Sequence, residues 1–191
     1  MGRTDFFLDS GIIYGQFDSK DDYHRGSLNH LSKYPYKDHN YYAVKRCALL
    51  EVRSIQKNKR SRPGNNNYRG AARLKTAQMK ESVEGLFLFN KVKDIDYKGV
   101  HASFDELYNI LFDFLELNKK DNNSKDRDAY ILTNAFIWDK EVSGLHNPRL
   151  VTIDRCDFVL NKDGLKCKAN DCLKNTTQMD FCLILARKHA S

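Results

Sequence analysis

The sequence predicts one α/β domain, a three-layer α/β/α sandwich in which helices cover both faces of a central, mainly parallel sheet. Short apolar runs typical of buried strands alternate along the chain with longer segments whose apolar residues recur at helical spacing. A length of 191 residues suits a single domain with a substantial core, so we assign residues 1–191 to one domain. Asp9 and Asp154 stand directly after strand-like runs, at the edge where parallel sheets bind ligands.

The N-terminal half is predicted to open with a strand and to continue with helices. Residues 6–8 form a short apolar run that stops at Asp9-Ser10-Gly11, which indicates a buried strand ending in a turn. The spacing of apolar residues then predicts three helices, at about 21–33, 38–57 and 68–89.

In the C-terminal half, helices separate three further strands. The clearest helix is expected at 101–117, where apolar residues recur every three or four positions. The remaining expected elements are a short strand within 91–100, a polar linker at 118–124, a helix at about 125–140, a strand that ends in Asp154 and a closing strand at 181–186.

Composition narrows the class of protein. A charged fraction of 30% leaves no room for a membrane span, and the first residues do not resemble a secretory signal, so we expect a cytoplasmic protein. The cysteines number five and form no dense framework, which favours reduced thiols over disulfides. Structural zinc usually shows tighter ligand pairs than Cys167 and Cys172, so we do not predict a zinc site.

Positive charge is concentrated in one connection, at about residues 53–75. Lysine and arginine exceed aspartate and glutamate by 32 to 25 over the chain, and this connection contains no acidic residue. Its basic residues are Arg53, Lys57, Lys59, Arg60, Arg62, Arg69, Arg73 and Lys75. The run Pro63-Gly64-Asn65 predicts a loop between two basic helix ends. The connection is either a solvated loop or a surface that contacts a phosphate backbone.

Asp128 is the most informative acidic residue. On a helical projection it shares a face with Ile131, Leu132, Ala135 and Phe136. An ionised carboxylate on an apolar face is costly unless it is paired, hydrogen-bonded or bound to a metal ion. A structural pair with an arginine is the alternative to a metal ligand.

Three other acids raise the same question less sharply. Glu51 shares a helix face with apolar residues, and a buried salt bridge would explain it equally well. Asp9 and Asp154 could each be a turn-forming or helix-capping acid. If the four carboxylates meet, however, they repel one another unless cations neutralise them. Such a group of hard oxygen ligands suits Mg²⁺ or Mn²⁺.

Three segments, in this order, resemble the signatures of the PIN domain family. Residues 7–14 are similar to its opening strand and turn, where an aspartate precedes Ser or Thr and then apolar residues. Residues 128–135 are similar to its helix with an acid followed by alanine. Residues 150–158 resemble its last signature, a strand that ends in Thr-x-Asp and is followed by Asp-Phe.

The resemblance implies a PIN-like fold and a metal-dependent endoribonuclease that hydrolyses phosphodiester bonds with Mg²⁺ or Mn²⁺. It implies that Asp9, Glu51, Asp128 and Asp154 are the catalytic metal ligands. Glu51 corresponds to the helix acid of the family by its order along the chain. Ser10, Thr152 and Asp157 would orient those carboxylates by hydrogen bonds, although Asp157 could equally cap the turn after the strand.

Two alternatives stay open beside the ribonuclease. One is a catalytically inactive PIN-like module that binds RNA, and the other is a nuclease that acts on structured DNA. The expected partner is nucleic acid, either single-stranded or structured RNA. The resemblance also allows an antitoxin-like or ribonucleoprotein partner and a homodimer.

Overall fold

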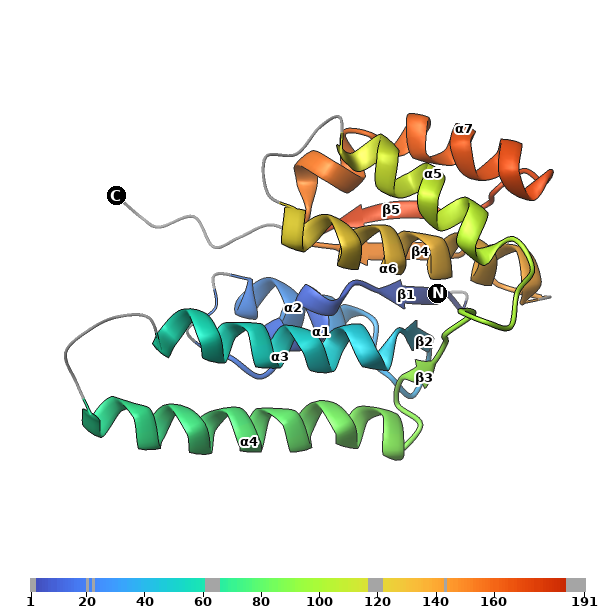
Figure 1. The fold of residues 1–191 in the computed structure, drawn as a ribbon. Coiled ribbons are helices and arrows are strands. Elements are labelled where there is room, and N and C mark those ends of the chain that lie inside the picture. Colours follow the sequence, from blue (N-terminus) through green and yellow to red (C-terminus); the bar gives the residue numbers. More distant parts are fainter. Residues whose placement is uncertain are drawn as a thin grey trace, which may run out of the picture.

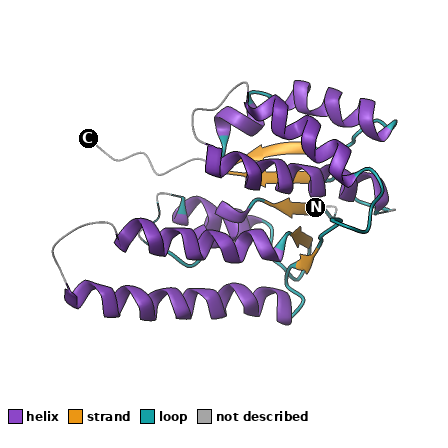
Figure 2. Ribbon diagram, in the orientation of Figure 1, coloured by secondary structure: helices purple, strands orange, loops and turns teal. Residues whose placement is uncertain are grey.

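Five short strands form one sheet in the computed structural model, in the order β3-β2-β1-β4-β5. Every neighbouring pair of strands is parallel. The strands are β1 (Asp5–Leu8), β2 (Asn40–Ala43), β3 (Lys93–Asp94), β4 (Arg149–Thr152) and β5 (Asp180–Leu183). Helices lie on both faces of this sheet (Figures 1 and 2), which confirms the predicted α/β/α sandwich.

The structure describes residues 3–19, 21, 23–60, 66–116, 122–142 and 144–184. For residues 53–60, 66–75, 116, 122–125 and 156 it describes the backbone alone. None of the helices in these ranges has the length and apolar character needed to cross a membrane. The described cysteines, Cys47, Cys167, Cys172 and Cys182, are all free.

The helices divide between the two faces of the sheet. On one side lie α1 (Ser10–Gly15), α2 (His24–Lys33), α3 (Lys45–Arg60) and α4 (Asn66–Leu88), although Cys47 at the start of α3 also packs into the opposite core. On the other side lie α5 (Phe104–Glu116), α6 (Asn122–Glu141) and α7 (Lys162–Leu173). A single turn of π-helix, η1 (Arg155–Val159), follows β4.

Alternating side chains of the central strand β1 connect the sheet to both layers. Phe6 and Leu8 pack into the core beneath α1 and α4, whereas Phe7 packs into the core beneath α5, α6 and α7. This follows from the two-residue period of a strand, whose successive side chains point to opposite faces. All three side chains are almost fully buried, and burial of each contributes roughly 1.5–3 kcal/mol to stability. The apolar run therefore reads as a strand covered on both faces.

Helices α3 and α4 form an antiparallel pair that extends past the sheet. The two helices pack against each other, and α3 also packs against α1. Figure 1 shows the pair reaching beyond the tip of β1, on the side toward which the arrows of β1 and β5 point. The end of α3 and the start of α4, which contain residues 53–60 and 66–75, therefore lie on the same side as the carboxyl ends of the strands.

One predicted helix was wrong at its start. The helix expected at 38–57 begins only at Lys45, because Asn40–Ala43 form β2 and pair with β1. Tyr41 and Tyr42 favour a strand, and their side chains enter the two opposite cores. Pairing with a strand more than thirty residues away therefore outweighs the local helical pattern.

Besides β2, three observed elements lie outside the predicted set. Helix α1 begins directly after β1, where only a turn was expected, because Ile12 and Ile13 are fully buried in the core on that face of the sheet. Neither η1 nor α7 was predicted, although Leu165, Ala169 and Leu173 of α7 follow one another at four-residue intervals and are all buried. The rest of α7 is largely polar, so its apolar stripe is narrow and its helical period is weak. The other expected helices and strands match the observed ones to within a few residues.

Candidate metal centre

The register of two neighbouring strands brings the acidic residues to one edge of the sheet. Strands β1 and β4 are parallel, with Leu8 opposite Val151. Their carboxyl ends therefore lie side by side, and Asp9 continues the ladder with a hydrogen bond from its N–H to the carbonyl oxygen of Val151 at 2.9 Å. Asp9 and Asp154 each follow closely on the end of one of these strands. This is the edge at which parallel sheets bind ligands.

Three carboxylates converge at this edge. One oxygen from each of Asp128, Asp154 and Asp157 lies within 4.8 Å of the others, and all three residues are half-buried. Asp128 comes from the second turn of α6, and Asp154 and Asp157 come from the turn after β4 and from η1. In the described part of the chain these three residues form the group whose geometry suits a metal ion. We call them the acidic triad.

Local hydrogen bonds hold two members of the acidic triad in place. Asp154 is the N-cap of η1, and its Oδ1 accepts a hydrogen bond from the backbone N–H of Asp157 at 2.7 Å. The backbone N–H of Asp154 in turn donates to the hydroxyl of Thr152 at 2.9 Å. An N-cap of this kind satisfies a free N–H of the first turn. The cap therefore fixes Asp154 and Asp157 close together before any ion binds.

Asp9 is buried beside the triad. Only 7% of its surface is exposed, and its Oδ2 accepts a hydrogen bond from the Thr152 hydroxyl at 2.8 Å. Ser10 makes a longer contact, with its hydroxyl 3.4 Å from Oδ1 of Asp9.

Burial raises the pKa of Asp9, and the negative charges of Glu51 and Asp154 raise it further. Hydrogen bonds from Thr152 and from the backbone of Gly11 oppose this rise. A nearby cation would stabilise the ionised form.

Glu51 lies close enough to influence Asp9, but its direct partner is Arg127. The two side chains form an ion pair in which the Arg127 guanidinium donates to Oε2 of Glu51. About a quarter of each side chain is exposed, 23% for Arg127 and 26% for Glu51. The salt bridge left open for Glu51 in the sequence is thus present. Its role as a metal ligand stays a prediction.

The predicted nucleic-acid contacts fall outside what the structure describes. Arg62 lies in a segment that is not described at all. For the other seven basic residues, Arg53, Lys57, Lys59, Arg60, Arg69, Arg73 and Lys75, the structure describes the backbone of α3 and α4 but not the side chains. Their contact with a phosphate backbone stays a prediction.

Asp157 and Arg127 make contacts in the structure that differ from those expected from the sequence. Asp157 was expected to orient other acids, whereas here its carboxylate is part of the acidic triad. The three-residue spacing from Asp154, an N-cap followed by an acid in the first turn, is the signal that brings the two together. Arg127 had no signal of its own, because its partner Glu51 is 76 positions away.

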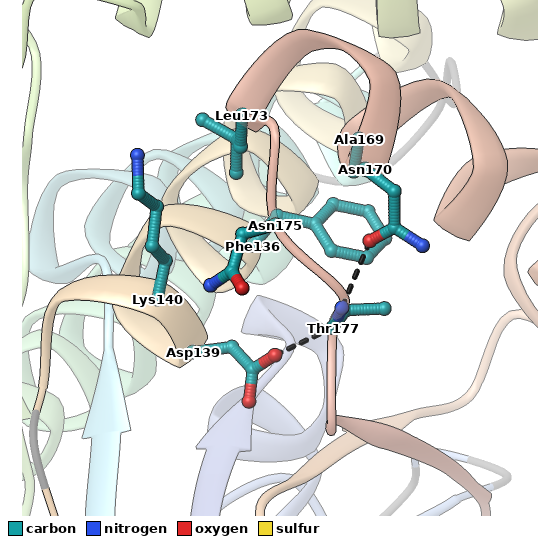
Figure 3. Close-up of a pocket in the computed structure, with 8 residues that line it drawn as sticks. All are labelled: Phe136, Asp139, Lys140, Ala169, Asn170, Leu173, Asn175 and Thr177. Carbon is teal, nitrogen blue, oxygen red and sulfur yellow. Dashed lines mark hydrogen bonds between the residues drawn. The ribbon is translucent and has the colours of Figure 1, made fainter.

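Away from the acidic triad, a small pocket lies near the amino end of β5 (Figure 3). Asp139 of α6 accepts a hydrogen bond from the Thr177 hydroxyl at 2.5 Å, and Asn170 of α7 accepts one from the Thr177 N–H at 2.8 Å. The pocket has a volume of about 10 Å³, which holds about one water molecule. These contacts anchor the loop before β5, and the pocket is too small for a substrate.

The acidic triad has the chemistry of a site for a hard divalent cation. Three carboxylates within a few ångströms repel one another, and a cation between them removes that repulsion. Mg²⁺ and Mn²⁺ prefer carboxylate oxygens, and Mg²⁺ usually keeps several of its waters. The buried Asp9, joined to the triad through Thr152, adds negative charge at the same place. The residues present therefore fit a divalent ion.

Comparisons with known proteins yield one likeness in structure. No family model matches the chain, and no curated protein matches it. The structure aligns with a chain in the crystal structure of VapBC2 from Rickettsia felis bound to a DNA fragment from their promoter. The identity is 16% and the TM-score is 0.45, over 84% of this chain and 92% of that chain. This TM-score is too low to establish a shared fold, so the function proposed below depends on the acidic triad and the sequence motifs.

Proposed function

We propose that this protein is a PIN-type nuclease that uses a divalent metal ion to hydrolyse phosphodiester bonds of RNA. The observation that carries the proposal is the convergence of Asp128, Asp154 and Asp157 at the carboxyl edge of a parallel sheet. These acids belong to two of the three segments that resemble PIN signatures. The third segment supplies Asp9, which the Thr152 hydroxyl links to the same edge.

In this proposal the acidic triad and Asp9 hold Mg²⁺ or Mn²⁺. The bound ion would supply an activated water and neutralise charge on the phosphate that is attacked. Thr152 positions the site, because its one hydroxyl donates to Asp9 and accepts from the N–H of Asp154. Ser10 supports Asp9 from the other carboxylate oxygen. RNA is the proposed substrate because most members of the resembling family act on it.

The test is cleavage of labelled single-stranded RNA with Mn²⁺ or Mg²⁺. We expect Asp128→Asn and Asp154→Asn to lower the rate by at least about tenfold to a hundredfold, the usual cost of disturbing a metal site. Asp113→Asn is the matched control, because Asp113 is an exposed acid on α5. Undiminished cleavage by both triad variants would refute the assignment, and preferential cleavage of flap-bearing DNA would redirect it to structured DNA.

A second candidate function follows from the ion pair between Arg127 and Glu51. Because Arg127 already neutralises the predicted fourth acid, the chain could be a PIN-like module that binds RNA without cutting it. Such a module would bind RNA in the presence of a chelator and would cleave none with any divalent ion. Glu51→Gln separates the two functions further, since loss of cleavage in this variant would support a catalytic role for Glu51. An antitoxin-like or ribonucleoprotein partner and a homodimer are further proposals from the same resemblance.

A further inference from the structure

A pocket of about 320 Å³ opens between α3, α5 and α6. Its size lies at the lower end of the range of small-molecule sites, roughly 300–1,000 Å³. We call it the α3/α6 pocket. The function proposed above does not use it, since no member of the acidic triad lines it.

Aromatic rings form one wall of the α3/α6 pocket. Tyr108 of α5 and Tyr130 of α6 both line it, with their ring centroids 6.4 Å apart and an angle of 71° between the rings. The hydroxyl of Tyr108 donates to Asp126, and the hydroxyl of Tyr130 donates to Asp96 at 2.6 Å. Because each hydroxyl is held, the rings have defined positions. Tyr108 is half-buried and lines the pocket, so it is accessible to a ligand bound there.

Two positive charges lie close to the Tyr130 ring. The guanidinium of Arg46 lies 5.3 Å from the centre of the Tyr130 ring, and the ammonium of Lys98 lies 5.9 Å from it. Both residues are exposed and both line the pocket. Cations beside aromatic rings in one pocket suit a ligand that is flat and carries negative charge. A nucleotide has both properties, with a planar base and an anionic phosphate.

The pocket adjoins the acidic edge through Arg127. Arg127 lines the pocket and is paired with Glu51, and it directly precedes Asp128 of the acidic triad in α6. One ion pair therefore separates the pocket from the buried acids. The acidic lining residues, Asp105 and Asp126, can accept hydrogen bonds from the amino groups of a base.

We propose that the α3/α6 pocket holds one unpaired nucleotide of a single nucleic-acid strand, with its base against Tyr108 and its phosphate at Arg46 and Lys98. The inference rests on the proposed nuclease function for its substrate class. Stacking on an aromatic ring requires a base that is not paired in a duplex. The pocket therefore selects single-stranded segments next to the bond that is cut.

The first test measures binding of a short single-stranded oligonucleotide in the presence of a chelator, so that no cleavage occurs. The probe carries 2-aminopurine, whose fluorescence falls when the base stacks. We expect Tyr108→Ala to weaken binding roughly 5- to 150-fold and to abolish the quenching, which is the range for loss of one stacked base. Tyr108→Phe keeps the ring and loses only the hydrogen bond to Asp126, so it should retain the quenching.

The second test replaces the two cations and does not disturb the core. Arg46→Gln combined with Lys98→Gln should weaken binding and lower its dependence on salt, because fewer counterions are released when a phosphate contact is lost. Lys91→Gln combined with Lys168→Gln removes the same charge from exposed positions that do not line the pocket. That control should bind almost as the wild type does. A matched duplex should be insensitive to Tyr108→Ala.

These measurements separate this inference from the nuclease proposal. Pocket-dependent binding without cleavage in any metal would support the pocket and refute the nuclease. Metal-dependent cleavage with unchanged binding and KM in the Tyr108→Ala and Arg46/Lys98 variants would support the nuclease and refute the role of the pocket. If circular dichroism shows that Tyr108→Ala does not fold, the binding of the Arg46→Gln, Lys98→Gln double variant decides the result. A wild-type protein that binds no single strand, as expected if the pocket holds a peptide, overturns the inference.

Discussion

Thr152 connects two acidic residues through a single hydroxyl. It is fully buried, it donates to Asp9 at 2.8 Å and it accepts from the N–H of Asp154 at 2.9 Å. A buried polar group that loses its partner costs more than the hydrogen bond itself contributes. Thr152 thus joins the end of β1 to the turn that carries the acidic triad.

We therefore expect Thr152→Val, which keeps the shape of the side chain, to lower the free energy of unfolding by about 1–3 kcal/mol. The reason is that both the carboxylate of Asp9 and the N–H of Asp154 lose a partner. Denaturant titration followed by circular dichroism measures the change. Thr152→Ser retains the hydroxyl and serves as the control. Equal stability of the valine variant and the wild type would show that these bonds contribute little.

The buried environment of His30 leads to a prediction about how stability depends on pH. It lies against the rings of Phe6, Tyr34 and Tyr41, and its Nε2 is buried with no hydrogen-bond partner in the described structure. Burial lowers the pKa of His30 from 6.5 to about 4, and the nearby His39, Lys33 and Arg149 act in the same direction. The folded protein therefore keeps His30 neutral where the unfolded chain would protonate it.

Because the folded pKa is depressed, the neutral His30 favours folding above the unfolded pKa of 6.5, and this contribution is lost as pH falls toward about 4. We expect the free energy of unfolding to fall across that window by up to about 1.4 kcal/mol per pH unit from this group. Denaturant titrations at a series of pH values measure the slope. His30→Phe should remove that part of the slope, and a slope unchanged in the variant would argue against this assignment.

At the scale of elements, the close approach of α1 and α2 depends on a glycine. A Cβ added to Gly15 would lie 2.8 Å from the hydroxyl oxygen of Ser27 and 3.6 Å from its Cβ. Ser27 is fully buried in α2, and its short side chain has little room to move. The two helices can therefore pack this closely only because position 15 has no side chain.

We expect Gly15→Ala to lower the free energy of unfolding by about 1–3 kcal/mol, the usual cost of overpacking. Removing the opposing hydroxyl should restore space, so the loss should be smaller when Gly15→Ala is made in a Ser27→Ala background. Thermal unfolding of the two single variants and the double variant forms the complete cycle. Additive effects in that cycle would mean that the two side chains do not clash.

At the scale of the whole molecule, the proposed ion would bridge three segments that are far apart in the sequence. The acidic triad combines α6 with the turn after β4, and Asp9 adds the end of β1. An ion bound there would connect segments far apart in sequence. A ligand that binds only the folded protein stabilises it in proportion to the logarithm of its concentration.

We therefore expect Mn²⁺ to raise the melting temperature of the wild type, with a stabilisation of about 2.7 kcal/mol at a hundred times the dissociation constant. Asp128→Asn and Asp154→Asn should show little or no rise. The exposed Asp113→Asn should behave as the wild type. Differential scanning fluorimetry with and without a chelator measures the shift, and an equal rise in all variants would place the ion elsewhere.

The sequence by itself determined the fold class and most of the elements. The run at Phe6–Leu8 specified β1 because an apolar run bounded by turn residues has few other uses. The helical spacing around Asp128 placed it on the same face as apolar residues, and the structure leaves its side chain half-buried. The ends of the apolar runs placed Asp9 and Asp154 just after β1 and β4. Such placements follow from local sequence because period is a property of a local segment.

Only the tertiary structure decided which residues meet. Strand β2 forms because it pairs with β1, and α7 forms because a narrow apolar stripe finds a core. Glu51 pairs with Arg127 across 76 positions, and Asp157 joins Asp128 and Asp154 through the cap at η1. Such contacts depend on distances across the folded chain, which local spacing does not encode. The sequence thus specified most of the elements and the positions of their acids, and the packing of α6 beside the turn after β4 brought the acidic triad together.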